Sequence, residues 1–219
     1  MNITNDVVSE YLQDHYKPLN EELNRLRIEA EENRVPIILK ETESFLELFL
    51  KIVKPKKILE IGSAVGYSAS FMAACLPDAK IFTIEKDHDV YETAKAKVKE
   101  LAYDNRITLL EGDGEECENA LFEQGESDFD LVFIDAAKSH YKRFFDASLR
   151  LSNKDTVFVC DNVLFKARTC SDEYDPNHKY KTNIRNMREF IEYITNDERF
   201  ETAVIAVGDG LSITRFKNE

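Results

Sequence analysis

Two groups of polar residues, each directly after a short apolar run, carry the strongest chemical signal in this sequence. Asp135 and Lys138 follow the run DLVFI, and Asp161-Asn162 follows the run TVFVC. Neighbouring parallel strands lie roughly 5 Å apart, so Asp135, Asp161 and Asn162 can converge if both runs are strands of one sheet. Three oxygen donors with open positions suit a hard cation, Mg²⁺ or Mn²⁺. The alternative is that Lys138 simply pairs with Asp135 or Asp161.

A second set of glycine and acidic residues follows three earlier apolar runs. Gly62 and Gly66 lie after the run KILEI, where glycine permits a tight strand-to-helix turn and close approach of a ligand. Glu85 ends the next run and could accept the hydroxyl hydrogens of a ribose, and Asp113-Gly114 follows the third in a turn able to lie against an adenine. Each signal alone is as often structural. Together they predict a pocket for an adenosine-containing cofactor.

Alternating strands and helices would bring these residues together. Runs rich in Ile, Val and Phe are typical of strands buried on both faces, and segments of helical length separate them. This order predicts a parallel sheet covered by helices on both faces, with ligands outside the carboxyl ends of the strands. Gly208-Asp209-Gly210 predicts a tight final hairpin, hence an antiparallel last strand. The predicted strands are Lys57–Ile61, Lys80–Ile84, Ile107–Leu110, Asp130–Ile134, Thr156–Cys160, Glu201–Val207 and Ser212–Phe216, and the predicted helices are Tyr67–Cys75, Asp87–Ala102, Glu115–Gln124, His140–Leu151 and Thr182–Asn196.

The region before the first strand is predicted to be helical. Apolar residues at helical spacing predict helix over residues 1–34, and a second helix over Thr42–Val53 that Pro55 ends. The length of 219 residues fits one domain with a single large core.

Composition limits the class of protein. Hydrophobic residues make up 43% and charged residues 32%, as in ordinary globular proteins. No run approaches the roughly 20 apolar residues of a membrane-spanning helix, and the polar N-terminus is unlike a secretory signal. The four cysteines show no CxxC pair or Cys/His metal spacing, so we expect reduced thiols in a cytoplasmic protein.

Charge is unevenly distributed along the chain. The net charge of −13 argues against indiscriminate binding of polyanions. Residues 164–188 nevertheless hold six basic residues against three acidic ones. This segment is either an ordinary solvated surface or a face that binds phosphates. The basic residues are Lys166, Arg168, Lys179, Lys181, Arg185 and Arg188.

The motifs LEIGSAVGYSA, FIDAAKSHY and CDNVL, together with Glu85, resemble the cation-dependent class I O-methyltransferases, which use S-adenosylmethionine. The resemblance extends from about Val35 to the C-terminus. It implies an α/β, Rossmann-like fold with a seven-stranded, mostly parallel sheet, one antiparallel strand and helices on both faces. It also implies a helical N-terminal lid (1–54) on the core (55–219), and commonly a homodimer.

The same resemblance implies roles for individual residues. Asp135, Asp161 and Asn162 would be the metal ligands. Asp135 and Lys138 would form the catalytic centre, with Lys138 receiving the acceptor proton. Val35–Ile38 would add backbone contacts to the cofactor. The cofactor contacts implied are Ile37, Glu60, Gly62, Ser63, Gly66, Ser68, Glu85, Asp113, Gly114 and Asp135.

The acceptor is less constrained than the chemistry. The family that the motifs resemble includes catechol and caffeoyl-CoA O-methyltransferases. Ala137 stands where plant-type relatives often have Asp, and the insertions by which they recognise a coenzyme A ester are missing. The tryptophan typical of catechol O-methyltransferase is missing as well. The stretches IDAAKSHY, DNVLFKAR and NIRNMREFIEYI resemble instead the bacterial tRNA 5-hydroxyuridine methyltransferases, which make 5-methoxyuridine at the wobble position. The tRNA anticodon loop is then the expected partner. The alternative acceptor is a small catechol-like vicinal diol.

Two other classes of protein fit less well. A regulatory protein that only binds the cofactor would not need the set Asp135, Lys138, Asp161 and Asn162. An NAD-linked dehydrogenase would carry GxGxxG, a pattern that Ala64 and Tyr67 interrupt here.

Overall fold

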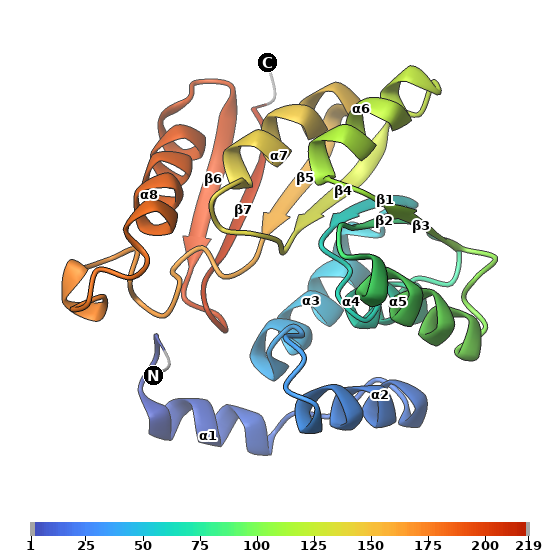
Figure 1. The fold of residues 1–219 in the computed structure, drawn as a ribbon, viewed down its shortest axis with the longest axis horizontal. Coiled ribbons are helices and arrows are strands. Elements are labelled where there is room, and N and C mark those ends of the chain that lie inside the picture. The colour runs from blue at the N-terminus through green and yellow to red at the C-terminus, as the bar shows by residue number, and fades with distance from the viewer. Residues whose placement is uncertain (1–2, 218–219) are drawn as a thin grey trace.

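The structure, a computed structural model, describes residues 3–217. Strands and helices alternate from residue 57 onward, as the hydrophobic pattern predicts (Figure 1). The strands are β1 (Lys57–Ile61), β2 (Lys80–Glu85), β3 (Ile107–Glu111), β4 (Phe129–Ile134), β5 (Ser152–Cys160), β6 (Phe200–Ile205) and β7 (Leu211–Phe216). The helices are α1 (Asp6–Asp14), α2 (Glu21–Glu32), α3 (Lys40–Val53), α4 (Tyr67–Cys75), α5 (His88–Glu100), α6 (Gly114–Glu123), α7 (Tyr141–Ser148) and α8 (Lys181–Asn196), with short 3-10 turns at Leu149–Leu151 and Asp172–Tyr174.

The seven strands form one sheet in the order β3-β2-β1-β4-β5-β7-β6. β7 runs antiparallel to both of its neighbours, and the other adjacent pairs are parallel. The chain starts in the middle with β1, builds outward to β3, and returns to place β4 on the other side of β1. Ile61 is in register with Ile84 of β2 and Ile134 of β4, so these strands end together. The predicted Rossmann-like sheet with one antiparallel strand is confirmed.

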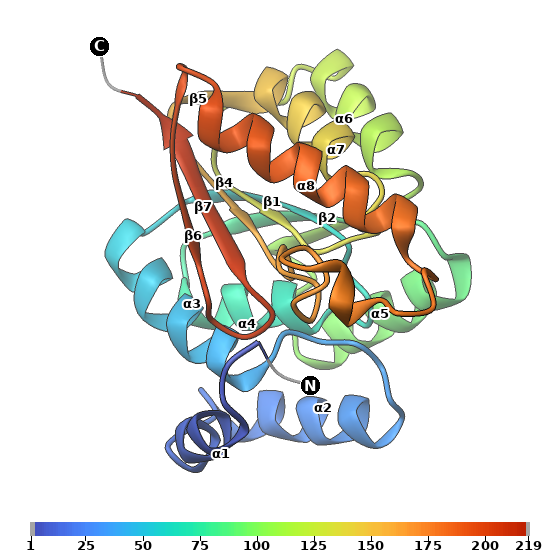
Figure 2. The same cartoon turned by 90° about the vertical axis from the view of Figure 1, so that its left-hand side faces the viewer.

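Helices cover both faces of the sheet, and each face has its own apolar core (Figure 2). Ile58 packs with α3 and α4, whereas its neighbour Leu59 packs on the opposite face with α7 and α8. β4 alternates in the same way, with Leu131 on the first face and Val132 on the second. All four side chains are at most 1% exposed. Burial on both faces explains why these strands read as continuous apolar runs.

The N-terminal region differs from the prediction. Residues 1–34 were predicted as one helical region, but α1 ends at Asp14 and α2 begins at Glu21, with Pro18 between them. The Asn20 side chain accepts a 2.8 Å hydrogen bond from Leu23 N and starts the second helix. Residues 1 and 2 lie outside the described part. Figure 2 shows α1 and α2 outside the layer formed by α3 and α4.

Two further boundaries were misplaced. β5 begins at Ser152, four residues before the predicted start. The prediction missed these residues because the stretch Ser152–Asp155 is polar and lacks the apolar pattern of a buried strand. α7 ends at Ser148 and continues as a 3-10 turn, whereas the predicted helix ran to Leu151. No helix within residues 3–217 has the length and apolar character required to cross a bilayer.

Candidate active site

A cavity of about 570 Å³ opens at the carboxyl ends of the central strands, beside the point where the chain crosses from one side of β1 to the other. This is where ligands bind in sheets of this type. Its walls come from the turns after β1, β2, β3, β4 and β5, from the segment before α3 and from the β6–β7 turn. Most of the predicted cofactor residues line it, namely Ile37, Gly62, Ser63, Ser68, Glu85, Asp113, Gly114 and Asp135.

The turn after β1 depends on glycine. Gly62 has φ +100°, and a Cβ there would lie 2.1 Å from the backbone oxygen of Asp135. Only a residue without a side chain lets this turn pass so close to β4. Gly66, with φ +78°, precedes α4 and lies outside the cavity lining. Gly66 shapes the turn, and its predicted contact with a cofactor stays a prediction.

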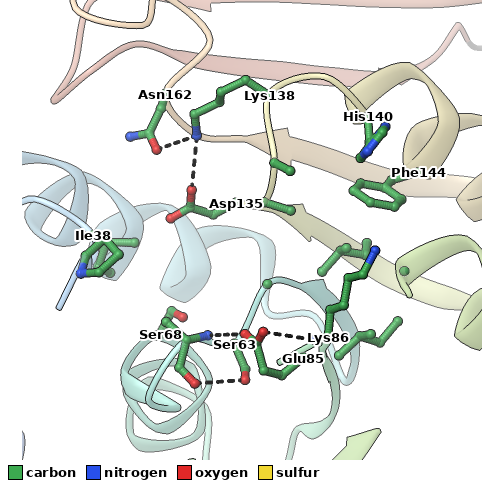
Figure 3. A pocket seen from close by; sticks show the side chains of 18 of the residues that line it. Ile38, Ser63, Ser68, Glu85, Lys86, Asp135, Lys138, His140, Phe144 and Asn162 are labelled. Carbon is green, nitrogen blue, oxygen red and sulfur yellow. Dashed lines mark hydrogen bonds and ion pairs between the residues drawn. The ribbon is translucent and has the colours of Figure 1, made fainter. Parts of the chain in front are cut away.

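Glu85 is held at the rim of the cavity by backbone donors. Its Oε2 accepts from Ala64 N at 3.0 Å, and its Oε1 accepts from Lys86 N at 2.8 Å and Asp87 N at 3.0 Å. Figure 3 shows Glu85 beside Ser63 and Ser68, away from Asp135, Lys138 and Asn162. The carboxylate is therefore fixed at one end of the cavity, in a position suited to the predicted ribose contact.

Asp113 and Gly114 form the wall after β3. Asp113 caps α6, and Arg143 Nη2 donates to both of its carboxylate oxygens at 3.0 and 2.9 Å. Burial favours a raised pKa for Asp113, but the hydrogen bonds and charge of Arg143 outweigh it and lower that pKa. A Cβ on Gly114 would lie 2.7 Å from the Phe144 ring. Glycine thus lets Phe144 form an apolar wall, which sequence reasoning missed.

Glu60 lies behind the cavity, not in it. Its side chain is fully buried and accepts a hydrogen bond from Thr83 Oγ1 of β2, while its other oxygen has no partner in residues 3–217. Burial raises the pKa of Glu60 to about 7. Strand alternation buries its side chain beneath the turn, and the predicted contact of Glu60 with the cofactor stays a prediction.

Lys138 lies between two of the predicted metal ligands (Figure 3). Its Nζ donates to Asn162 Oδ1 at 2.8 Å and to Tyr141 Oη at 3.0 Å, and lies 3.5 Å from Asp135 Oδ1. Tyr141 Oη in turn donates to the Asp161 backbone oxygen at 2.7 Å. The residues that sequence reasoning placed at the ends of β4 and β5 do converge. Tyr141, three residues after Lys138, was missed as the group that holds it.

Asp161 is the buried member of this group. It is fully buried, its Oδ1 accepts from Asn162 N at 2.6 Å, and its Oδ2 has no hydrogen-bond partner in the described chain. Burial first, and then the negative charge of Asp135, raise the pKa of Asp161 well above its ordinary value. An unpartnered buried carboxylate oxygen is costly. A cation beside it would remove that cost, so the donor set fits a hard divalent metal.

The oxygen donors form an open site, not a closed one. Across residues 3–217, no three His, Cys, Asp or Glu side chains cluster in a way that could hold a metal. The set Asp135, Asp161 and Asn162 therefore depends on the amide oxygen of Asn162. Such a set leaves positions for water or an acceptor.

A buried polar cluster joins the N-terminal helices to the cavity. Arg27 of α2, Glu43 of α3 and Tyr67 of α4 are each at most 2% exposed. Arg27 Nη2 donates to the Glu43 carboxylate and, at 2.9 Å, to the Ile38 backbone oxygen, and Tyr67 Oη donates to Glu43 Oε2 at 2.6 Å. Tyr67 and the segment 36–38 line the cavity. This segment, and not α1 or α2 themselves, is the N-terminal part of the wall.

The basic residues of segment 164–188 do not all face solvent freely. Arg188 donates to Asp172 Oδ1 at 2.8 Å and to the Thr169 backbone oxygen at 2.8 Å, so it stabilises its own loop. Arg168 lies over the rings of Phe165 and Tyr180. Lys166 is exposed and lines the cavity. Two members of the predicted phosphate-binding set thus make structural contacts and one lies on the cavity rim, whereas Lys179, Lys181 and Arg185 are exposed elsewhere on the segment.

Known proteins share this chain's sequence and fold. The family described as O-methyltransferase matches residues 9–217. The chain is 29% identical to the caffeoyl-CoA O-methyltransferase of Populus kitakamiensis over 78% of this chain and 74% of that protein. It is 34% identical to the catechol O-methyltransferase of Niastella koreensis over 55% of each. The O-methyltransferase TomG of Streptomyces achromogenes, solved with SAM, has a TM-score of 0.81 and 25% identity, and the match covers 98% of this chain and 97% of that one. The chain therefore belongs to the S-adenosylmethionine-dependent O-methyltransferases of the caffeoyl-CoA and catechol type.

Proposed function

We propose that this protein methylates a hydroxyl group of a small catechol-like acceptor with the help of a divalent cation, Mg²⁺ or Mn²⁺. The observation that carries the proposal is the group Asp135, Lys138 and Asn162 at one end of the cavity. Asp161, next to Asn162, is not part of the cavity lining, and its Oδ2 is buried and unpartnered among the described residues. The likeness to a catechol O-methyltransferase supports the choice of acceptor.

One end of the cavity would bind the cofactor and the other end would bind the acceptor. Glu85 would hold the ribose, Asp113-Gly114 and Phe144 would enclose the adenine, and Ser63 and Ser68 would contact the methionine portion. These residues would hold S-adenosylmethionine, the methyl donor, in the same cavity as Lys138. Fixing the acceptor and the methyl group in line supplies much of the rate enhancement. The segment Pro36–Ile38 would close this end, consistent with a lid (1–54) on a core (55–219) in one domain.

The acceptor proton would go to Lys138. Tyr141 and Asn162 fix its Nζ at the acceptor end, where Lys138 would receive the proton as the hydroxyl oxygen attacks the methyl group. Asp135, Asp161 and Asn162 would hold the cation, whose charge lowers the pKa of a hydroxyl bound beside it. Two adjacent oxygens on the acceptor match such an open set of ligands.

A second candidate acceptor is 5-hydroxyuridine at the tRNA wobble position. The exposed cation of Lys166 on the cavity rim, with Lys179 and Lys181 further along the same segment, favours it. If tRNA binds here, reversing the charges of Lys166 and Lys181 together should weaken its binding in a salt-dependent way. The same charge change at Lys80 and Lys154, two exposed lysines elsewhere, is the matched control.

The test of the proposal is methyl transfer from labelled S-adenosylmethionine to catechol, beside bulk tRNA that contains 5-hydroxyuridine, each with Mg²⁺ and with chelator. Label in catechol that disappears with chelator is the expected result. Label in tRNA alone would identify tRNA as the acceptor instead of catechol and would leave the proposed methyl transfer unchanged. Absence of label in both would overturn the proposal.

We also propose a homodimer. α1 and α3 expose large apolar side chains, including Val7 at 72%, Tyr11 at 62% and Ile52 at 70%. A second copy is the partner that would cover them. Light scattering after gel filtration should give twice the monomer mass, and Tyr11→Asp with Ile52→Asp should reduce it to the monomer mass. A monomeric wild type would contradict the dimer.

A further inference from the structure

The loop that leaves β5 carries three successive residues in the left-handed region of backbone conformation. Phe165 has φ 47°, Lys166 has φ 53° and Ala167 has φ 63°. None of them is glycine, and a side chain in this conformation crowds the following carbonyl oxygen, so each residue costs conformational free energy. A run of this kind persists only where surrounding contacts hold it.

The turn between β6 and β7 supplies contacts of this kind, in addition to the loop's own 3.0 Å hydrogen bond from Arg168 N to the Phe165 backbone oxygen. Asp209 Oδ1 accepts from Lys166 N at 2.5 Å, and the Asp209 backbone oxygen accepts from Leu164 N at 3.1 Å. Gly210 O accepts from Val163 N at 3.0 Å. A Cβ on Gly210 would lie 2.4 Å from Leu164 Cγ, so this turn is pressed against the loop. The Asp209 carboxylate is therefore bonded directly to the left-handed run.

The run forms one wall of the cavity. Phe165, Lys166 and Asp209 line the same cavity as Lys138 and Asn162. The Phe165 ring packs edge-on against Tyr180, with ring centroids 5.3 Å apart. Because Asn162 begins the same loop, the run joins a predicted cation ligand to the outer part of the acceptor end.

We propose that Asp209 is a positioning residue for the acceptor. Its carboxylate holds residues 165–167 in the left-handed conformation and so fixes the Phe165 wall against which the acceptor ring binds. Asp209 acts through the loop, so its loss should affect acceptor binding more than the methyl transfer step or cofactor binding. The part concerning the acceptor rests on the proposed function, whereas the part concerning the loop does not.

The loop is tested without any acceptor. The sequence has no tryptophan, so Phe165→Trp places the single tryptophan on the run. In this background, Asp209→Ala should raise the acrylamide quenching constant about twofold or more, because the run loses its clamp. Asp209→Asn should keep quenching near the parent value, since its amide oxygen still accepts from Lys166 N. The exposed Asp155→Ala is the control. Equal quenching in Asp209→Ala and Asp155→Ala would overturn the proposal.

Kinetics with catechol test the consequence for the acceptor. Asp209→Ala should raise the acceptor KM roughly tenfold, with kcat and the cofactor Kd changed less than about threefold. Ala167→Gly added to Asp209→Ala should restore part of the KM, because glycine adopts this conformation without the penalty. An unchanged KM in Asp209→Ala, or no restoration by Ala167→Gly, would overturn the proposal. If wild type does not methylate catechol, the acceptor assignment fails and quenching still decides the role of Asp209.

Discussion

Lys138 Nζ lies 2.8 Å from Asn162 Oδ1 and donates a hydrogen bond to it, although the two residues follow different strands. The bond links the side chain proposed to take the acceptor proton with a proposed cation ligand. Tyr141 extends the link, since it accepts from Lys138 and donates to the Asp161 backbone oxygen. The residues proposed for proton transfer and for cation binding thus belong to one hydrogen-bonded group at the ends of β4 and β5.

Lys138→Met should reduce turnover by about 100-fold or more, the usual contribution of a positioned general base. Tyr141→Phe keeps the amine and removes one group that holds it, so it should cost only about tenfold. Single-turnover rates with saturating cofactor separate the two variants. Equal losses, or full activity in Lys138→Met, would contradict the assignment of Lys138.

Gly62→Ala should either unfold the protein or abolish binding of the cofactor. The new Cβ would meet the Asp135 backbone oxygen at 2.1 Å, in addition to the cost of φ +100°. Gly125→Ala is the matched control, because Gly125 has φ +84° and its Cβ would meet nothing within 4 Å. It should cost about 1 kcal/mol and leave cofactor affinity unchanged. Urea unfolding and calorimetric titration with S-adenosylmethionine measure both effects, and similar behaviour of the two variants would disprove the close contact.

Arg27→Ala should reduce the free energy of unfolding by about 3 kcal/mol or more, because it leaves the Glu43 carboxylate buried without its cation. It should also weaken cofactor binding, since Arg27 holds the Ile38 backbone oxygen beside the cavity. Arg25 lies exposed on the same helix, and Arg25→Ala should change the stability by less than about 0.5 kcal/mol. If both variants unfold at the same urea concentration, the buried cluster does not anchor the N-terminal helices.

The raised pKa of Glu60 should make the free energy of unfolding depend on pH. Its pKa of about 7 in the folded protein lies above the ordinary value of 4.5, so the folded state binds this proton more tightly than the unfolded state. The stabilising contribution is complete below pH 4.5 and is lost as pH rises to 7, for a total of about 3 kcal/mol. Glu60→Gln should reduce the slope by this amount and leave the part that comes from Asp161, whose pKa is also raised. Urea unfolding at pH 5 and pH 8 in chelator checks it, and an equal slope in the variant would show that Glu60 is not its source.

The sequence was sufficient to predict the sheet and most of the cavity, for a physical reason. Apolar runs buried on both faces are visible in the sequence, and the rule that ligands bind beyond the strand ends then selects Gly62, Glu85, Asp113, Asp135 and Asn162. Each of these residues is the last residue of a strand or lies one or two residues beyond it. Their positions depend on local chain order and little else.

Features that depend on long-range packing could not be predicted in the same way. Asp209 and Lys166 are 43 residues apart and meet through a turn and a loop that have no periodic pattern. Glu60 is adjacent to cavity residues in sequence, but the alternation of a strand turns its side chain away. The break before α2 was missed because helical spacing of apolar residues continues on both sides of Pro18.

The most direct test of the account is the effect of Asp161→Ala on methyl transfer to catechol, measured beside the affinity of the same variant for S-adenosylmethionine. We expect turnover with Mg²⁺ to fall by about 100-fold or more while the cofactor Kd changes less than about threefold, because Asp161 is a proposed cation ligand and lies outside the proposed cofactor wall. Asp155→Ala should behave as wild type. Full activity in Asp161→Ala, or an equal loss of cofactor binding and turnover, would contradict the account.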